Sequence, residues 1–202
     1  VDAALPWLHA RQHALTLVHL DQVDYAGHNE GGVSSPNWDA AATRADGLIK
    51  EIAQTLDFRR DTLLVIADHG HIGGQDAIVR VLPFVLAGAG VKPGQYADIN
   101  QVDVAPAVTA LLGTALPASA QGRAIREMLN LSPEALDSLV KAERAQQAAL
   151  AQAYGAAIGR PVQPGAGADA YATQQAMDRA RDARLVVERW PRIAVALVLL
   201  VG

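Results

Sequence analysis

The chain has no cysteine among its 202 residues, so disulfide bonds and thiolate metal sites are excluded. Aromatic residues make up only 4% of the sequence, and acidic residues outnumber basic ones to give a net charge of -4. No basic stripe with interleaved aromatic residues is present, so we expect no nucleic-acid partner. With 50% hydrophobic residues, the chain can build a core of ordinary domain size.

A full-length membrane span is also lacking, although residues 193–201 are unbrokenly apolar. A span needs roughly 20 such residues. This run follows Arg189-Trp190-Pro191-Arg192, which is typical of a membrane interface. We therefore interpret residues 189–202 as the start of a transmembrane helix, and we expect both ends of the chain to be cut. The alternative is a hydrophobic C-terminal strand or helix of the domain.

The periodicity of the remaining sequence predicts an α/β fold. Residues 14–20 and 62–67 are apolar, partly β-branched runs that predict buried strands. Between them, residues 36–56 follow helical spacing, with Ser35 as N-cap and Pro36 in the first position. Strand, helix and strand form a βαβ unit, which implies parallel strands. Residues 79–87 predict a third strand, and Pro83 favours an edge or irregular strand there.

Further helices are predicted over residues 3–13, 103–112, 133–157 and 170–188, with Asp103 as the N-cap of the second. A Pro- and Gly-rich linker over residues 160–167 separates the last two. The expected architecture is a largely parallel sheet flanked by helices, followed by a helical C-terminal stalk. We expect a metalloenzyme domain over 1–128, the stalk over 129–188 and the membrane segment over 189–202.

Two clusters of Asp and His follow the two predicted buried strands. Asp24 and His28 form the first, and Asp68 and His69 form the second. In open α/β sheets, ligands bind beyond the carboxyl ends of the strands, so both clusters could face one site. Asp and His are ligands of borderline divalent metals such as zinc. The sequence thus predicts a metal site; the alternative is that the carboxylates cap turns and the histidines are satisfied locally.

Three more residues lie close to these clusters in the sequence. His19 lies inside the first predicted strand, where we expect a core or near-site histidine rather than a ligand. Asp21 is expected to orient a ligand histidine or to cap the turn. His71 lies near enough to the site for a metal-binding or supporting role, and the sequence leaves the two open.

The segments Asp24-Tyr25-Ala26-Gly27-His28 and Ala67-Asp68-His69-Gly70-His71, supported by residues 86–94, 102–106 and 111–113, resemble the alkaline phosphatase superfamily. The likeness covers about residues 1–128. It is closest to the type I phosphodiesterase and nucleotide pyrophosphatase branch, the sulfatase-like branch and the membrane-bound phosphoethanolamine transferases. The resemblance implies a partial alkaline-phosphatase-like fold. It also implies two divalent metals, zinc or alternatively manganese, one held by Asp24 and His28 and the other by Asp68 and His69.

The chain departs from the pattern of that family in two places. The family takes its Ser or Thr nucleophile and an earlier Asp ligand from an N-terminal half, so no residue here is assigned the nucleophile and we expect the 202 residues alone to be inactive. The family also follows Asp-His-Gly-His with a Gly-Gly-His element, where this chain has Gly73-Gly74-Gln75. Either Gln75 replaces the histidine or a short deletion removes it. On both alignments the third ligand beside Asp24 and His28 is missing, and His71 is the available substitute.

The resemblance implies a metal-dependent hydrolase or transferase that acts on phosphate or sulfate esters: a phosphodiesterase- or phosphatase-like enzyme, or a phosphoethanolamine transferase. It also implies a membrane-associated protein whose catalytic domain is extracytoplasmic. The alternative is a degenerate, inactive member that serves as a membrane-tethered binding domain. A soluble phosphomutase of the same superfamily is a third reading, against which the apolar C-terminal run argues.

Overall fold

The computed structural model of the chain describes residues 1–72, 75–77 and 82–201. The chain divides into two compact units, Val1–Asp98 and Ile99–Gly202. The predicted metal-binding residues all belong to the first unit. The predicted domain boundaries after residues 128 and 188 stay predictions.

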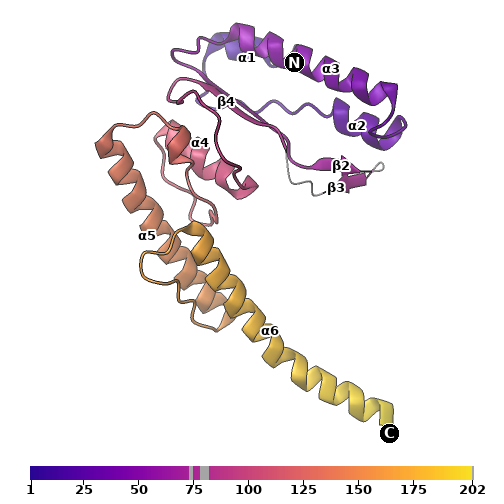
Figure 1. Ribbon diagram of the computed structural model, residues 1–202, viewed down its shortest axis with the longest axis vertical. Helices are drawn as coiled ribbons and strands as arrows, with labels where there is room; N and C mark the ends of the chain where they lie inside the picture. Colours follow the sequence, from indigo (N-terminus) through magenta and orange to yellow (C-terminus); the bar gives the residue numbers. More distant parts are fainter. Residues whose placement is uncertain (73–74, 78–81, 202) are drawn as a thin grey trace. The chain divides into compact units, whose positions relative to one another are not determined.

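Three helices form one side of the first unit: α1 (Leu5–Ala10), α2 (Gln22–Asn29) and α3 (Pro36–Thr55) (Figure 1). Helix α3 starts at the predicted cap, where the Ser35 hydroxyl accepts a hydrogen bond from the Trp38 N–H at 3.1 Å. Helix α2 packs against α3, and Ala26 and Ala41 are each only 1% exposed. Small side chains therefore let the two helices approach closely.

The strands of the first unit pair in antiparallel fashion. Strand β1 (Thr62–Ile66) pairs with β4 (Phe84–Gly88), and β2 (Gly70–Ile72) pairs with β3 (Gln75–Ala77) (Figure 1). The structure is thus mixed helix and strand, as an α/β class requires. A largely parallel sheet is not found in the described part of the chain.

The predicted strand over residues 14–20 is wrong, because this segment runs extended without pairing to a strand among the described residues. Its apolar side chains do not enter a core: Leu15 is 63% exposed and Leu17 is 88% exposed. A buried parallel strand needs neighbours at its edges and helices on its faces. Without such neighbours, β-propensity alone does not make a strand.

The third predicted strand is observed in its second half. Strand β4 begins after Pro83, which agrees with the inability of proline to donate to a ladder. Residues 79–81 of this prediction lie outside the described residues. At the other end, the Ala89 N–H donates to the Asp61 carbonyl at 2.9 Å and closes the β1–β4 pair.

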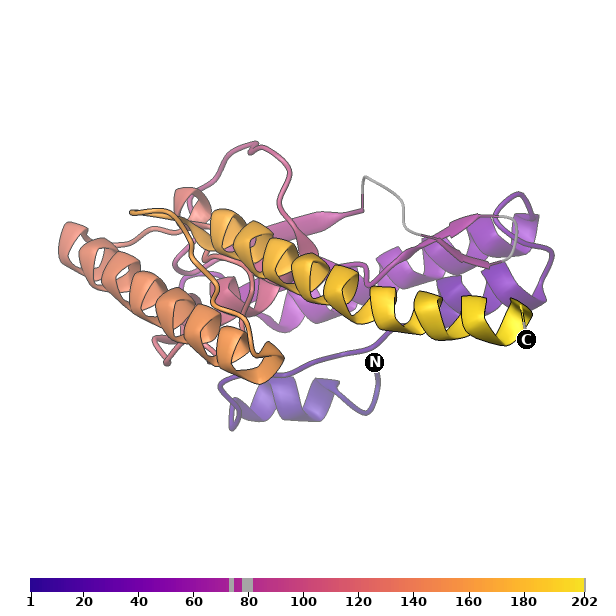
Figure 2. The same cartoon turned by 90° about the horizontal axis from the view of Figure 1, so that it is seen from below.

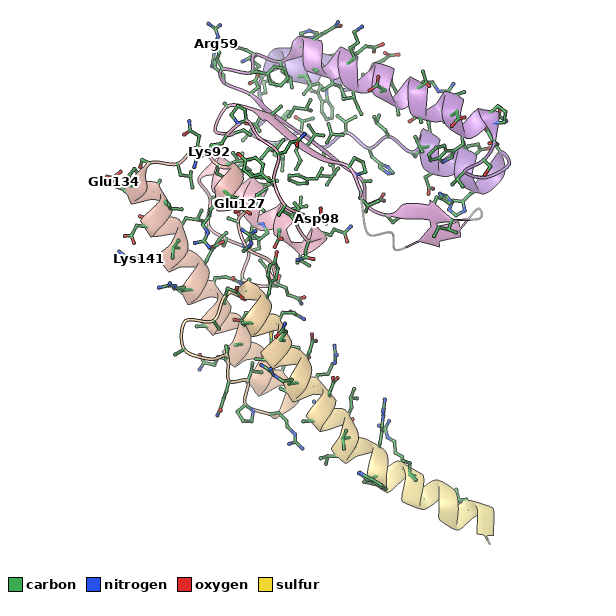
Figure 3. The ribbon with its side chains drawn as sticks, in the orientation of Figure 1. Arg59, Lys92, Asp98, Glu127, Glu134 and Lys141 are labelled. Carbon is green, nitrogen blue, oxygen red and sulfur yellow. The ribbon has the colours of Figure 1, made fainter. Side chains whose placement is uncertain are left out.

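The second unit is helical. It contains η1 (Gln101–Asp103), α4 (Val104–Leu112), η2 (Arg126–Met128), α5 (Pro133–Ile158) and α6 (Ala170–Val201). Helices α5 and α6 lie side by side, as both views of the ribbon show (Figures 1 and 2). Their outer faces carry charge, and Figure 3 shows Glu134 and Lys141 projecting from α5. Ile125 and Leu129 are fully buried and anchor the core of this unit.

Asp103 precedes α4 at the predicted N-cap position, but its side chain does not cap that helix. The carboxylate is instead fully buried. It accepts hydrogen bonds from the N–H groups of Asn100 and Arg123, both at 2.9 Å, and from the Tyr171 hydroxyl. A buried carboxylate needs such donors. Through these hydrogen bonds, the Asp103 carboxylate links η1 to the segment before η2 and to helix α6.

Helix α6 extends well beyond the predicted end at residue 188 and contains Pro191. In the described part of the chain, no helix combines the length and the apolar character that crossing a membrane requires. The interpretation of residues 189–202 as the start of a membrane span is therefore not supported. Residues 189–201 form the last part of α6, whose earlier turns are rich in charged residues.

Candidate metal centre

Helix α2 places the first predicted pair of metal ligands. The sequence predicts a turn here, but Asp24 and His28 lie in the first and last turns of a helix. Residues four apart share one helix face, and the helix dipole favours an acid near its start and a base near its end. His28 Nε2 lies 3.5 Å from Asp24 Oδ1. The pair is partly open to solvent, with 37% of the His28 side chain exposed and 47% of that of Asp24.

Strand β2 brings a third side chain to the same place. His71 Nδ1 lies 3.7 Å from Asp24 Oδ1, and the rings of His71 and His28 meet edge to face with centroids 4.4 Å apart. The His71 side chain is only 7% exposed. One possible ligand atom from each of Asp24, His28 and His71 lies within 4.8 Å of the others. We call these three residues the metal-binding group, because together they could hold one metal ion.

The second predicted pair lies at the margin of this group. The His69 ring nitrogen Nε2 is 3.8 Å from Asp24 Oδ1 and 3.7 Å from Asp68 Oδ2. Asp68 is largely exposed at 74%, and its Oδ1 accepts a hydrogen bond from the His69 N–H at 3.0 Å. His69 Nδ1 lies 3.1 Å from the Gly70 carbonyl oxygen. Three imidazoles thus surround one carboxylate oxygen, that of Asp24.

The two remaining predicted residues stand apart. His19 is exposed in the extended segment before α2, and Asp21 is exposed at the N-cap position of α2, where its side chain does not cap the helix. Among the described residues, neither belongs to the group whose possible ligand atoms converge. The predicted placement of His19 inside a buried strand is wrong because that strand does not form.

The chemistry of the donors fits a divalent metal ion. Asp24 Oδ1 and His71 Nε2 are buried atoms with no hydrogen-bond partner among the described residues. Leaving buried polar atoms unpaired costs about 1–3 kcal/mol each. One carboxylate and two imidazoles are also the ligand set of a catalytic zinc site with an open position. A bound cation would satisfy the carboxylate and fix the tautomers of both rings.

The sequence left open whether His71 binds the metal or supports other ligands, although its spacing from His69 indicated that both could face one site. His69 and His71 are two apart, and alternate residues of an extended strand lie on one face. Their ring centroids are 6.3 Å apart in the structure.

Comparison with known proteins agrees with this chemistry. The family model of type I phosphodiesterase / nucleotide pyrophosphatase matches residues 2–157. Because the match covers most of the chain, the protein belongs to this family, which lies within the alkaline phosphatase superfamily. No match was found among curated proteins or among solved structures. The family generally depends on metals and acts on phosphodiesters.

Proposed function

We propose that the protein is part of a metal-dependent enzyme that hydrolyses or transfers phosphate esters, and that Asp24, His28 and His71 hold one of its metal ions. The convergence of these three side chains from α2 and β2 is the observation that carries the proposal. The family match supports the phosphoryl-ester chemistry. Sulfate esters remain the chemical alternative, because a tetrahedral oxyanion binds the same kind of centre.

The roles of the chain's own residues follow from their charge and burial. Asp24 supplies the only carboxylate within the metal-binding group, so it offsets half the charge of a divalent cation. His28 contributes from the partly exposed side, whereas His71 contributes from the buried side. A metal ion held there would act as a Lewis acid on a phosphoryl oxygen and would lower the pKa of a bound nucleophile. The exposed side is where an ester could approach.

A second metal, held by Asp68 and His69, belongs to the same proposal. The two residues adjoin the metal-binding group through His69, whose Nε2 lies near Asp24 Oδ1. Two-metal phosphoryl-transfer sites place their ions about 4 Å apart. Asp68 and His69 lie close enough to Asp24 to hold a second ion at such a spacing. Zinc is the proposed metal, since Asp and His suit it, and manganese is the alternative.

Activity and metal content test the proposal together. The intact protein is stripped with chelator, reloaded with Zn²⁺ or Mn²⁺, and assayed on bis(p-nitrophenyl) phosphate. We expect hydrolysis that requires metal and that falls at least about 100-fold in Asp24→Asn. Asp39→Asn is the matched control, because Asp39 is an exposed carboxylate in the first turn of another helix, α3. Absence of both metal binding and hydrolysis would refute the proposal.

A degenerate binding domain is the second candidate, and the sequence Gly73-Gly74-Gln75 favours it, since it lacks the histidine of the family element. This candidate predicts one metal per chain and no turnover with any phosphate ester. The number of metal ions per chain, measured in the wild type and in the Asp68→Ala variant, separates the enzyme from the binding domain. Loss of a second metal in that variant would support the enzyme.

Membrane association is proposed separately. Helix α6 exposes Val186, Trp190 and Leu199, and Arg189 and Arg192 lie among them. Exposed apolar and cationic side chains on one helix favour an interface with anionic lipid. Cosedimentation of the intact protein with phosphatidylserine vesicles tests this. We expect binding that weakens in the variant Trp190→Ala; equal recovery with and without vesicles would contradict it.

A further inference from the structure

Gly27 lies directly beneath the imidazole of His71. It is a buried residue of α2, next to His28 in the sequence. A Cβ atom built on Gly27 would lie 2.5 Å from His71 Cε1, 2.6 Å from Nδ1 and 3.0 Å from Nε2. Real Cβ atoms essentially never approach other atoms to under 3.0 Å. The face of the ring therefore occupies the space that any other amino acid would fill at position 27.

Helix propensity does not account for glycine at this position. Glycine inside a helix costs about 1 kcal/mol relative to alanine. Gly27 is not among the residues with positive φ, so its backbone does not require glycine either. In the described structure, a side chain at position 27 would meet the His71 ring, which would then have to shift.

We propose that Gly27 is a positioning residue of the metal centre: by lacking a side chain, it admits the His71 imidazole to the place where that ring meets Asp24 and His28. This inference rests on the proposed metal-binding function and adds to it the reason why His71 can serve as the third ligand. His71 is 7% exposed, so its ring has little free space into which it could move. A methyl group at position 27 displaces the ring from the other two ligands.

The variant Gly27→Ala tests this through metal affinity. Gly47→Ala is the matched control, because Gly47 is also inside a helix, α3, and a Cβ there would meet nothing within 4 Å. The intact, metal-free protein is titrated with Co²⁺, whose visible absorption reports the number and type of ligands. We expect Gly27→Ala to weaken Co²⁺ binding about 10- to 100-fold and to change the spectrum. Gly47→Ala should keep the wild-type affinity and spectrum.

A double-mutant cycle with His71→Ala separates positioning from general destabilisation. If Gly27 acts through His71, the Gly27→Ala change has no further effect on Co²⁺ affinity once His71 is alanine. If Gly27→Ala alone fails to fold, the double variant should fold, because the clash is gone. The inference is overturned if Gly27→Ala binds Co²⁺ like the wild type, or if its effect persists in the His71→Ala background.

The same titration distinguishes failure of this inference from failure of the proposed function. Wild-type protein that binds neither Co²⁺ nor Zn²⁺ removes the metal site itself, and both ideas fall. Wild-type protein that binds metal, together with an unaffected Gly27→Ala variant, leaves the enzyme proposal standing and removes only the role of Gly27.

Discussion

The Nδ1 atom of His71 lies 3.7 Å from the Oδ1 atom of Asp24, across the contact between strand β2 and helix α2. The two residues belong to different sequence motifs. Within the described residues, Asp24 Oδ1 and His71 Nε2 are both buried and have no hydrogen-bond partner. This pairing links the two motifs of the first unit into one group of ligands. In the proposed metal centre, His71 takes the place of the histidine that the Gly73-Gly74-Gln75 segment lacks.

Removing the charge of Asp24 is expected to weaken metal binding more than removing any single imidazole. Asp24 Oδ1 lies within 3.8 Å of ring nitrogens of His28, His69 and His71, so its carboxylate faces all of them. Calorimetric titration with Zn²⁺ should show at least about a 100-fold loss of affinity in Asp24→Asn, beyond the loss in His28→Ala. A larger loss in His28→Ala would contradict the central place given to Asp24.

Replacing Tyr171 by phenylalanine should destabilise the second unit. The Tyr171 hydroxyl donates to the fully buried carboxylate of Asp103, and the variant removes this donor. A buried acceptor that loses a donor costs about 1–3 kcal/mol of unfolding free energy. Urea denaturation followed by circular dichroism measures it, with Tyr25→Phe as the control because Tyr25 is exposed. Equal midpoints in the two variants would show that the contact adds nothing.

The Arg123–Glu127 pair should make stability depend on pH. Two hydrogen bonds, at 2.8 and 2.6 Å, join the guanidinium to the carboxylate and lower the pKa of Glu127 from 4.5 to about 2. A lowered folded-state pKa stabilises the protein above the unfolded value, and this contribution is lost as pH falls from 4.5 toward 2. Since 42% of the Glu127 side chain is exposed, we expect a contribution of only about 1 kcal/mol.

The measurement compares Glu127→Gln with wild type in urea at about pH 6 and about pH 3. The difference in unfolding free energy should shrink at the lower pH. Glu51→Gln, which alters an exposed carboxylate on α3, is the control and should show a smaller pH-dependent difference. A Glu127→Gln difference that is the same at both pH values would contradict the assignment.

Gly88→Ala should disrupt the β1–β4 pair. Gly88 has φ +111°, and a Cβ there would lie 2.2 Å from the Asp61 carbonyl oxygen. That carbonyl accepts the hydrogen bond that closes the pair, so relief of the clash breaks it. We expect a loss of about 2 kcal/mol or more in unfolding free energy, from backbone strain together with the lost contact. Amide hydrogen exchange of Leu63 and Val65 should speed up in this variant; unchanged exchange would contradict the prediction.

Local sequence signals predicted helices α3, α4 and α5 well, because caps and helical periodicity act over a few residues, whereas α2 was predicted as a turn. Ser35 caps α3 as expected, and its hydroxyl accepts the N–H of Trp38, three residues further on. Ser132 caps α5 in the same way by accepting the N–H of Ala135. The Asp24–His28 spacing likewise indicated a shared site, although the local backbone is a helix rather than a turn. In each case the sequence contains both partners of the interaction within one or two helical turns.

Sheet topology was not predictable in the same way, because strand pairing depends on segments far apart in the chain. The apolar segment over residues 14–20 has strand-like composition, yet it finds no strand partner among the described residues and leaves Leu17 largely exposed. Strand β1 pairs instead with β4 in antiparallel register. Similarly, Asp103 matched a capping pattern, but burial beside Tyr171 gave its carboxylate other donors.

The sequence by itself determined the superfamily, the Asp and His residues proposed as metal ligands, and helices α3, α4 and α5, because these depend on motif identity and short-range periodicity. Only the tertiary structure decided which histidines meet Asp24, since that depends on how β2 packs against α2. The position of His71 follows from the space above Gly27, and no spacing in the sequence encodes such a contact between separate elements.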